Sequence, residues 1–393
     1  MKKYGFTRLL AVTVLLNIAT SLVHPVTPLF IKTRNLPDFM FGIMFAAMAF
    51  GSFVTGPLWG RLADRFGRLP VMMVSTVGYA AAQLTFGFMS DPVIIAILRL
   101  LSGMMVMGST VALMASAVDL TDPANRAQKL SYYAAAMGIA SPLGFLLGGL
   151  VGNISIQAAF TAQAVMLAAV CFCMPWLLGE TLKPRMQPSC ESDGTQDHVR
   201  APKSKIVLPI ILFYIGVVAA QFGAGGYDNA FNYYLTNDLG YMPSINGAVK
   251  GITGMLGLIA NLTLNTLVVR KYNLDISLTS VLLLCAVSLA VVVLIPGGTL
   301  FFIVNGIFYM FSAMFVPLQQ ALSTERQAQG HGILSGVYNS SRSLGMMAGA
   351  LSAGFTYTLN SKLPFVHQAV SFAVAAVVTY IGYALTSRRR PSK

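Results

Sequence analysis

Charged residues are scarce in this chain: Lys, Arg, Asp and Glu together make up only 10% of its 393 residues. A soluble protein of this length would carry about a quarter of such residues. The hydrophobic residues, 55% of the total, arrive in runs of roughly 20, the length at which an α-helix crosses a hydrocarbon core of about 30 Å. The shortage of charge therefore argues against a soluble protein and predicts a helical protein that crosses a membrane many times.

Cysteine is also rare, and its placement argues against two kinds of site. Cys171, Cys173 and Cys285 lie in apolar runs, and Cys190 lies in a polar stretch. None has metal-ligand spacing with histidine partners, and no pairing suggests a disulfide framework. We interpret three of them as packing residues and Cys190 as an exposed thiol, and we expect no metal and no cofactor.

The chain also lacks the sequence marks of an enzyme. It has no Ser/His/Asp set, no His/Cys metal cluster and no glycine-rich loop for nucleotide phosphates. We therefore predict that it is not an enzyme and that ATP is not its direct energy source.

The apolar runs predict twelve membrane spans. The first six cover about residues 8–31, 39–60, 69–89, 93–118, 129–152 and 156–178, and the second six about 206–235, 243–269, 275–295, 299–321, 331–357 and 364–386. We predict an all-α membrane protein with two pseudo-symmetric six-helix bundles. The expected parts are an N-terminal bundle over 1–178, a cytoplasmic linker over 179–205, and a C-terminal bundle with a basic tail over 206–393. The first run is expected to be a retained helix rather than a cleaved signal.

The distribution of positive charge predicts how the chain is oriented. The net charge of +13 could suggest a nucleic-acid partner, but twenty of the 26 Lys and Arg fall in segments on one side of the predicted topology. The other side holds only Lys32, Arg34 and Lys362. Because cytoplasmic loops are enriched in Lys and Arg, we predict that both termini are cytoplasmic and that the protein lies in a cell membrane, as in a bacterial inner membrane. No nucleic-acid partner is expected.

Asp228 is the one acidic residue deep inside a predicted span. An ionisable group at that depth costs several kcal/mol unless it is paired or hydrated, so it is a functional candidate. Tyr214, Gln221, Gly225 and Asn232 accompany it at helical spacings, within about 60° of one another around the helix. We predict that Asp228 exchanges protons or binds a cationic substrate. Three glycines nearby are expected to weaken this helix, as in the broken helices of transporter sites; they are Gly223, Gly225 and Gly226.

Three further predicted spans carry polar stripes that could face Asp228. They are Asn17, Thr20, His24 and Pro28 on the first span, Asn246, Lys250, Gly254, Gly257 and Asn261 on the eighth, and Asn305, Tyr309, Ser312 and Gln319 on the tenth. Lys250 could pair with Asp228 or extend toward the membrane surface. With Tyr227 and other aromatic residues, these stripes predict an adaptable pocket. The alternative is that the polar groups only hold the helices together.

Arg99, Arg342 and His24 are ionisable groups for which more than one role is open. Arg342 lies near the middle of the eleventh span, where it could hold an anionic group or pair with another helix. His24 could titrate near neutrality, although a hydrogen-bonded structural histidine is the simpler interpretation. Arg99 could extend toward the membrane surface.

The two halves of the chain repeat one short pattern. Leu143-Gly144 and Gly148 in the fifth span recur as Leu344-Gly345 and Gly349 in the eleventh. Two related halves around a central site are what alternating access requires.

The charged segment Gly60–Leu69, which reads G-R-L-A-D-R-F-G-R-L, resembles the signature loop between helices 2 and 3 of the major facilitator superfamily, G-x-L-A-D-R-x-G-R. The resemblance implies transport by rocking of two halves. It also implies that Asp64 caps the eleventh helix and that Arg65 reaches Asp119. The gating residues it implies are Gly60, Asp64, Arg65, Gly67, Arg68, Asp119 and Arg126.

Within the superfamily, Arg99-Leu-Leu-Ser-Gly103 resembles the R-x-x-x-G motif of the drug/proton antiporter branch. This resemblance implies that Arg99 takes part in proton coupling, the alternative to a position at the membrane surface. The fifth span departs from that branch, since Gly149 and Asn153 stand where the branch has proline and glycine. The resemblance implies a monomeric, proton-coupled exporter of small hydrophobic compounds. The alternatives are a transporter of a polar metabolite, such as a sugar or an anionic or zwitterionic solute, and a protein that transports nothing, either a sensor or a membrane enzyme.

Overall fold

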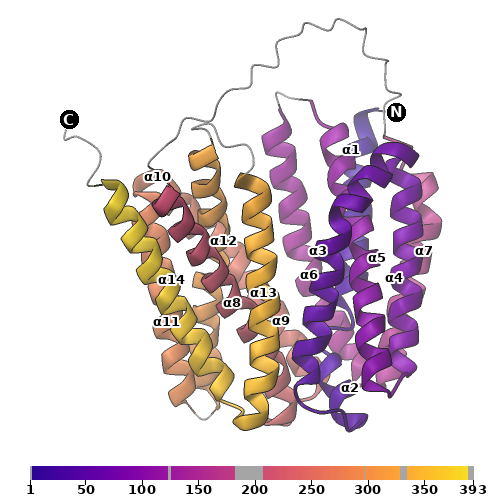
Figure 1. Ribbon diagram of the computed structural model, residues 1–393. Helices are drawn as coiled ribbons and strands as arrows, with labels where there is room; N and C mark the ends of the chain where they lie inside the picture. Colours follow the sequence, from indigo (N-terminus) through magenta and orange to yellow (C-terminus); the bar gives the residue numbers. More distant parts are fainter. Residues whose placement is uncertain (1, 123–124, 182–206, 296, 328–333, 388–393) are drawn as a thin grey trace, which may run out of the picture.

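The computed structural model describes residues 2–122, 125–181, 207–295, 297–327 and 334–387. Every regular element within these ranges is helical (Figure 1). Only residues 179–181 of the predicted linker 179–205 are included, so the rest of that segment and Cys190 lie outside the described residues.

In chain order, the elements are α1 (Lys2–Ser21), α2 (Thr27–Thr33), α3 (Met40–Phe66), α4 (Arg68–Phe88), α5 (Pro92–Asp119), α6 (Arg126–Gly152), α7 (Ile156–Leu177), α8 (Val207–Asn237), α9 (Pro243–Ala260), the π-helical turn η2 (Asn261–Asn265), α10 (Thr266–Lys271), α11 (Leu274–Leu294), α12 (Thr299–Gln327), α13 (Leu334–Leu359) and α14 (Leu363–Ser387).

These elements confirm the predicted twelve-span fold. Within the described residues, ten helices are long and apolar enough to cross a membrane, one of which runs through α9, η2 and α10. The remaining two spans are the first, made of α1 and α2, and α13, which carries many Gly and Ser residues and Arg342. The chain is therefore a multi-pass helical membrane protein.

The first span is interrupted rather than continuous. The helix stops at Ser21 and resumes at Thr27, and the turn between them holds His24 and Pro25. Pro25 and Pro28 cannot donate a backbone hydrogen bond, and the turn uses short-range bonds such as His24 N to Ser21 O at 3.3 Å. His24 is therefore presented from an irregular segment.

The glycines predicted to weaken the seventh span do not interrupt its helix. The helix α8 runs without interruption across Gly223, Gly225 and Gly226. These glycines serve close packing instead, since a Cβ on Gly225 would lie 3.0 Å from Met346 Cα on α13. The missing side chains let the neighbouring backbone approach and leave the helix intact.

The helices form two groups side by side, the N-half (α1–α7) and the C-half (α8–α14), and the start of α1 and the end of α14 lie at the same end (Figure 1). We call this end the basic end, because its described segments carry Arg61, Arg65, Arg68, Arg126 and Lys129. The opposite end holds α2 and the turn before α3.

The glycine repeat has the same structural role in both halves. A side chain on Gly144 or Gly148 of α6 would overlap the carbonyl oxygens of Ile18 and Leu22 in the first span. In the C-half, a side chain on Gly345 or Gly349 of α13 would overlap the carbonyl oxygens of two residues of α8, Val218 and Phe222. Glycines four residues apart lie on the same face of a helix and permit such close contact. This packing explains the repeat seen in the sequence.

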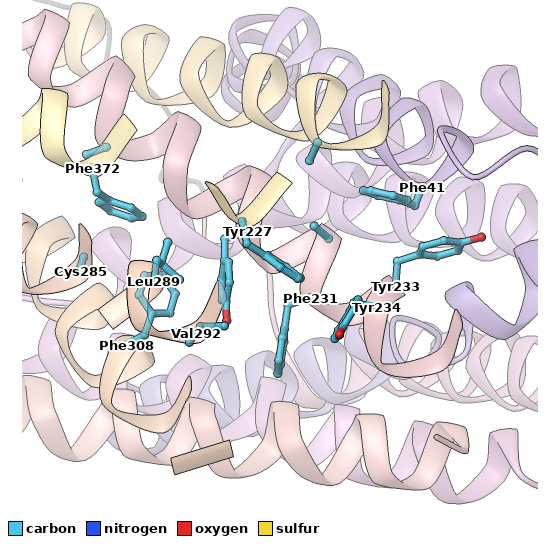
Figure 2. Packing of buried hydrophobic residues seen from close by; sticks show 14 of the residues in the cluster. Phe41, Tyr227, Phe231, Tyr233, Tyr234, Cys285, Leu289, Val292, Phe308 and Phe372 are labelled. Carbon is cyan, nitrogen blue, oxygen red and sulfur yellow. The ribbon is translucent and has the colours of Figure 1, made fainter. Parts of the chain in front are cut away.

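The buried hydrophobic residues form two clusters. One lies in the N-half near the basic end and includes Phe6 and Trp59. The other fills the C-half and continues into the N-half at the opposite end through Leu22, Phe30 and Phe41. Figure 2 shows part of this second cluster. The apolar core therefore joins the two halves at the opposite end.

Candidate functional site

A cavity of about 580 Å³ lies between the two halves, and we call it the main cavity. Its walls come from α6, α9, η2 and α12, and α8 contributes Asp228. From Asp228, Lys250 and Tyr309 it extends along α6 to Ser131, in the first two turns of that helix, and so toward the basic end. Most of the surface is apolar, with small residues such as Gly254 on α9.

Asp228 is the centre of the polar part of this cavity. Its carboxylate pairs with the Lys250 ammonium of α9, and its Oδ1 accepts a hydrogen bond from the Tyr309 hydroxyl of α12 at 2.9 Å. Lys250 Nζ also donates to the Asp228 carbonyl oxygen at 3.3 Å and lies 5.7 Å from the centre of the Tyr309 ring. Three helices therefore meet at one carboxylate.

The two members of the ion pair differ in exposure. The Asp228 side chain is 50% exposed, and the Lys250 side chain is 9% exposed. Lysine thus supplies a nearly buried counter-charge, while one side of the carboxylate faces the cavity. A proton or a cationic group that enters the cavity can compete with Lys250 for this carboxylate, because each would neutralise the same charge.

Tyr227 and Asn305 support this centre from behind. Both are almost fully buried. The Tyr227 hydroxyl donates to Asn305 Oδ1, and Asn305 Nδ2 donates to the Phe301 carbonyl at 2.7 Å. The centre of the Tyr227 ring lies 4.5 Å from that of Phe308 and 6.0 Å from that of Tyr309. The predicted pocket-lining residues Tyr227 and Asn305 therefore hold Tyr309 in place and do not line the main cavity.

Of the other predicted pocket residues, Asn261 lines the main cavity on the turn η2. Gln221 and Gln319 are buried, 2% and 1% exposed, and do not line it. Asn17 borders a separate small cavity within the N-half, where its amide donates to Thr13 O at 2.9 Å. Arg342 is half-buried on α13 and also lies outside the main cavity.

Asn232, Asn246 and His24 meet at the junction of the two halves. Asn232 Nδ2 donates to the His24 carbonyl at 3.1 Å, and Asn246 Nδ2 donates to the Pro25 carbonyl at 3.3 Å. The irregular turn of the first span leaves these carbonyls free of helical hydrogen bonds, so amides from α8 and α9 can bind them. These contacts close the end of the cavity that faces away from the basic end.

Aromatic and carboxylate side chains complete this closure at the opposite end. The Tyr233 hydroxyl of α8 donates to Asp38 Oδ1 at 2.6 Å, and the Tyr233 ring stacks on Phe41 of α3 at 4.9 Å. Phe39 stacks on Phe355 of α13 at 5.5 Å. We call these residues the outer contact. The sequence did not predict it, since spacing alone does not pair residues that lie 195 positions apart, as Asp38 and Tyr233 do.

Arg99 is 4% exposed on α5. Its guanidinium lies over the Phe86 ring, with Cζ 4.5 Å from the ring centre. It donates to Thr27 Oγ1 at 3.3 Å and to Gln83 Oε1 at 3.5 Å. It therefore does not extend to the membrane surface, one of the two alternatives left open by the sequence.

At the basic end, two of the predicted gating residues, Asp64 and Asp119, bind a third, Arg68. Its guanidinium binds Asp64 Oδ1 at 2.5 Å and Asp119 Oδ2 at 3.1 Å. The expected contact of Arg65 with Asp119 is thus made by Arg68, while Arg65 is exposed and lies over the Phe66 ring. Arg68 makes the contact because it begins α4, which packs on α5, whereas Arg65 is in the last turn of α3.

The other predicted gating residues lie at the basic end, in turns or near the ends of helices. Gly67 adopts φ +103°, a left-handed conformation that favours glycine between α3 and α4. A side chain on Gly60 would meet open space. Arg126 begins α6 and is exposed. The Asp64 side chain is 72% exposed and binds Arg68. The start of the eleventh span, which Asp64 is predicted to cap, lies outside the described residues.

Glu180 makes contacts at the basic end that the sequence did not indicate. Its carboxylate accepts hydrogen bonds from two backbone groups at the start of α4, Arg68 N at 2.9 Å and Leu69 N at 3.1 Å. Thr181 beside it contacts Ser116 of α5 at 3.3 Å. A carboxylate favours a helix N-terminus because it meets unpaired N–H groups there. The end of the sixth span is thereby fastened to the gating segment.

Two helical halves, a cavity between them and an ion pair at membrane depth define the class of protein: a membrane transporter with a central site. Residues 9–350 match the family model of the Major Facilitator Superfamily. The chain belongs to this superfamily, which confirms the resemblance of segment 60–69, and it is a secondary transporter.

Similar proteins in other organisms are drug-resistance proteins. Multidrug resistance protein 2 of Bacillus subtilis is 23% identical over 372 residues, 94% of this chain and 91% of that protein. Quinolone resistance protein NorA of Staphylococcus aureus is 21% identical over 368 residues, 93% of this chain and 92% of that protein. These names agree with the predicted likeness to the drug/proton antiporter branch.

Solved structures show the same fold. A bacterial homologue of the human lysosomal transporter Spinster, in an inward-facing conformation, superimposes with a TM-score of 0.77 at 14% identity, covering 100% of this chain and 99% of that one. A peptide transporter superimposes with a TM-score of 0.76 at 13% identity, covering 98% and 94%.

Proposed function

We propose that this protein exports small, mostly hydrophobic compounds in exchange for protons, and that Asp228 is the shared site of proton and cargo. One observation carries the proposal: a half-exposed carboxylate, held by Lys250 and Tyr309, stands in a largely apolar cavity of about 580 Å³. Pockets of this size and character suit drug-sized ligands. The resistance proteins similar to this chain support the same cargo class.

The transport cycle follows from the two ends of the cavity. With the outer contact closed, cargo enters from the basic end and displaces Lys250 from Asp228. When the halves rock, the cavity opens at the opposite end and cargo leaves. A proton then neutralises Asp228, which weakens its ion pair and lets the halves return. Proton and cargo exclude one another at a single carboxylate, and this exclusion makes the exchange coupled.

We also propose the placement of the chain in the cell. The basic end faces the cytoplasm, since positive residues gather on the cytoplasmic side, and the membrane is a bacterial inner membrane. The functional unit is a monomer. The proposed divisions are an N-terminal bundle at 1–178, a linker at 179–205 and a C-terminal bundle at 206–393, because the described helices α1–α7 and α8–α14 form separate groups.

Flux measurements in proteoliposomes test the proposal. An imposed pH gradient should drive accumulation of lipophilic fluorescent dyes, while sugars and organic anions should not move faster than in vesicles without protein. Saturable flux of a sugar or an organic anion, without any dye flux, would contradict the proposed cargo. Dye flux that ignores the pH gradient would contradict proton exchange.

A further inference from the structure

Arg99 is a buried charge that lies outside the main cavity. Its neighbours within hydrogen-bonding range are neutral: Thr27 Oγ1 at 3.3 Å, Gln83 Oε1 at 3.5 Å and the Met48 sulfur at 3.8 Å. Its Nε has no hydrogen-bond partner among the described residues. A buried charge without a counter-charge is costly, so buried charges are normally paired.

The described acidic residues near this region are already engaged. Asp228 pairs with Lys250 and accepts from Tyr309. Asp38 accepts from Tyr233. The ion pairs in the described part of the chain are made by Arg68 and Lys250, and none includes Arg99. The residues that the structure describes therefore give this guanidinium no negative partner.

A small cavity of about 40 Å³ borders Arg99. Its walls include His24 and Thr27 of the N-half, and Asn229 and Asn232 of α8 in the C-half. A single water needs about 10–15 Å³ of such volume, so the cavity has room for a few waters or one small ion. The two amides and the imidazole offer N–H groups besides those of the guanidinium.

We propose that this small cavity binds a monovalent inorganic anion such as chloride, with Arg99 as its principal ligand. The anion supplies the counter-charge that the described protein groups do not. Because the cavity is walled by both halves, a bound anion stabilises the conformation in which the outer contact is closed. Its size admits chloride or bromide and excludes large organic anions. The site is separate from the main cavity and does not depend on which cargo is carried.

Thermal unfolding of the purified protein tests this site. Chloride replaces gluconate at constant ionic strength. The midpoint temperature of unfolding should rise and then saturate, by about 2–5 °C when the chloride concentration is a hundredfold above its Kd. The matched variants are Arg99→Gln, which should lose the rise, and Arg34→Gln, which should keep it. Arg34 is a suitable control because it belongs to the same half and its contact with Ser90 is exposed.

Binding of radioactive chloride to the wild-type protein gives a readout that needs no variant. Bromide should displace it and gluconate should not, and crystals soaked in bromide should show anomalous scattering beside Arg99. No displaceable chloride on the wild-type protein, or unchanged affinity in Arg99→Gln, would overturn the proposal. If Arg99→Gln fails to fold, the anomalous signal alone decides: a peak beside Arg99 supports the site, and no peak there refutes it.

Discussion

At the scale of single residues, the site depends on one carboxylate with two unequal partners. Lys250 is nearly buried, so loss of Asp228 would leave an unpaired cation in a low-dielectric environment, and such losses are strongly destabilising when burial is complete. Tyr309 adds a hydrogen bond to a charged acceptor, worth about 1.5–3 kcal/mol. In the proposed cycle, cargo or a proton takes the place of Lys250 at this carboxylate.

Tyr309→Phe tests the hydrogen bond without disturbing the packing. The ring would keep its contacts with Tyr227 and Phe231, while Asp228 would lose one donor. We expect apparent cargo affinity or exchange rate to change by about tenfold or more, measured as dye flux against concentration. Tyr234→Phe is the matched control, because that ring packs on Phe301 and Phe365 and should leave flux unchanged. Equal flux in Tyr309→Phe and wild type would contradict the role of the hydroxyl.

Much of this centre could be predicted from residue type and helical spacing. Asp228 and Lys250 stood out because charge at membrane depth needs a partner. The inward position of Tyr227 and Asn305 behind Tyr309 could not be predicted, since it depends on which side of α12 packs against α8. The exchange of Arg65 for Arg68 at Asp119 also depends on where α3 ends, which sequence patterns locate only to within a few residues.

At the scale of elements, irregular backbone occurs at two places that differ from the predicted one. Two prolines break the first span and expose carbonyls that bind Asn232 and Asn246. The eighth span contains the π-turn η2, which carries Asn261 into the cavity wall. Glycines alone did not break α8, because neighbouring helices pack directly onto them. Glycine and proline in a sequence mark places where a helix can be interrupted, but the packing of neighbouring helices decides whether it is.

Gly42→Ala tests the outer contact. A Cβ at Gly42 of α3 would overlap the Ala350 carbonyl oxygen and lie 3.0 Å from Gly354 Cα, both on α13. Overpacking of this kind costs about 1–3 kcal/mol, so the closed state should lose about 5–150-fold in population. The measurement uses spin labels on Lys32→Cys and Asn360→Cys in a background without native cysteines. The distance between the two labels should be longer in Gly42→Ala than in the parent protein.

The control for this experiment is Gly306→Ala. It makes the same change inside a helix, but its Cβ would lie 3.5 Å from a Leu256 methyl group, an ordinary contact. The distances should stay at the parent values. Unchanged distances in Gly42→Ala would show that the two halves do not need this close approach.

Glu180→Ala tests the fastening of the sixth span to α4. Removing two hydrogen bonds and a favourable charge at a helix N-terminus should cost about 1 kcal/mol. The thermal midpoint of the purified protein should fall, and Glu180→Gln should fall less because the amide oxygen still accepts. Asp122→Ala, at an exposed position before α6, is the control. A midpoint equal to wild type in Glu180→Ala would mean that the contact contributes nothing to stability.

At the scale of the whole molecule, the two halves meet at the opposite end and enclose a cavity that extends to the basic end. The repeated glycine contacts of α1 with α6 and α8 with α13 build each half in the same way. The apolar core crosses between the halves only where the outer contact lies, in the described part of the chain. The twelve spans and the repeat could be predicted from hydropathy and glycine spacing. The conformation could not, because it depends on contacts between distant residues.

The most direct test of the central claim is Asp228→Asn in proteoliposomes with an imposed pH gradient. Asparagine can still accept hydrogen bonds from Lys250 and Tyr309, so the protein should fold and bind dye, as thermal unfolding and equilibrium binding would show. It cannot take up and release a proton in the same way, so gradient-driven dye accumulation should fall to the level of vesicles without protein. Accumulation at the wild-type rate, with the same response to the pH gradient, would contradict the central role of Asp228.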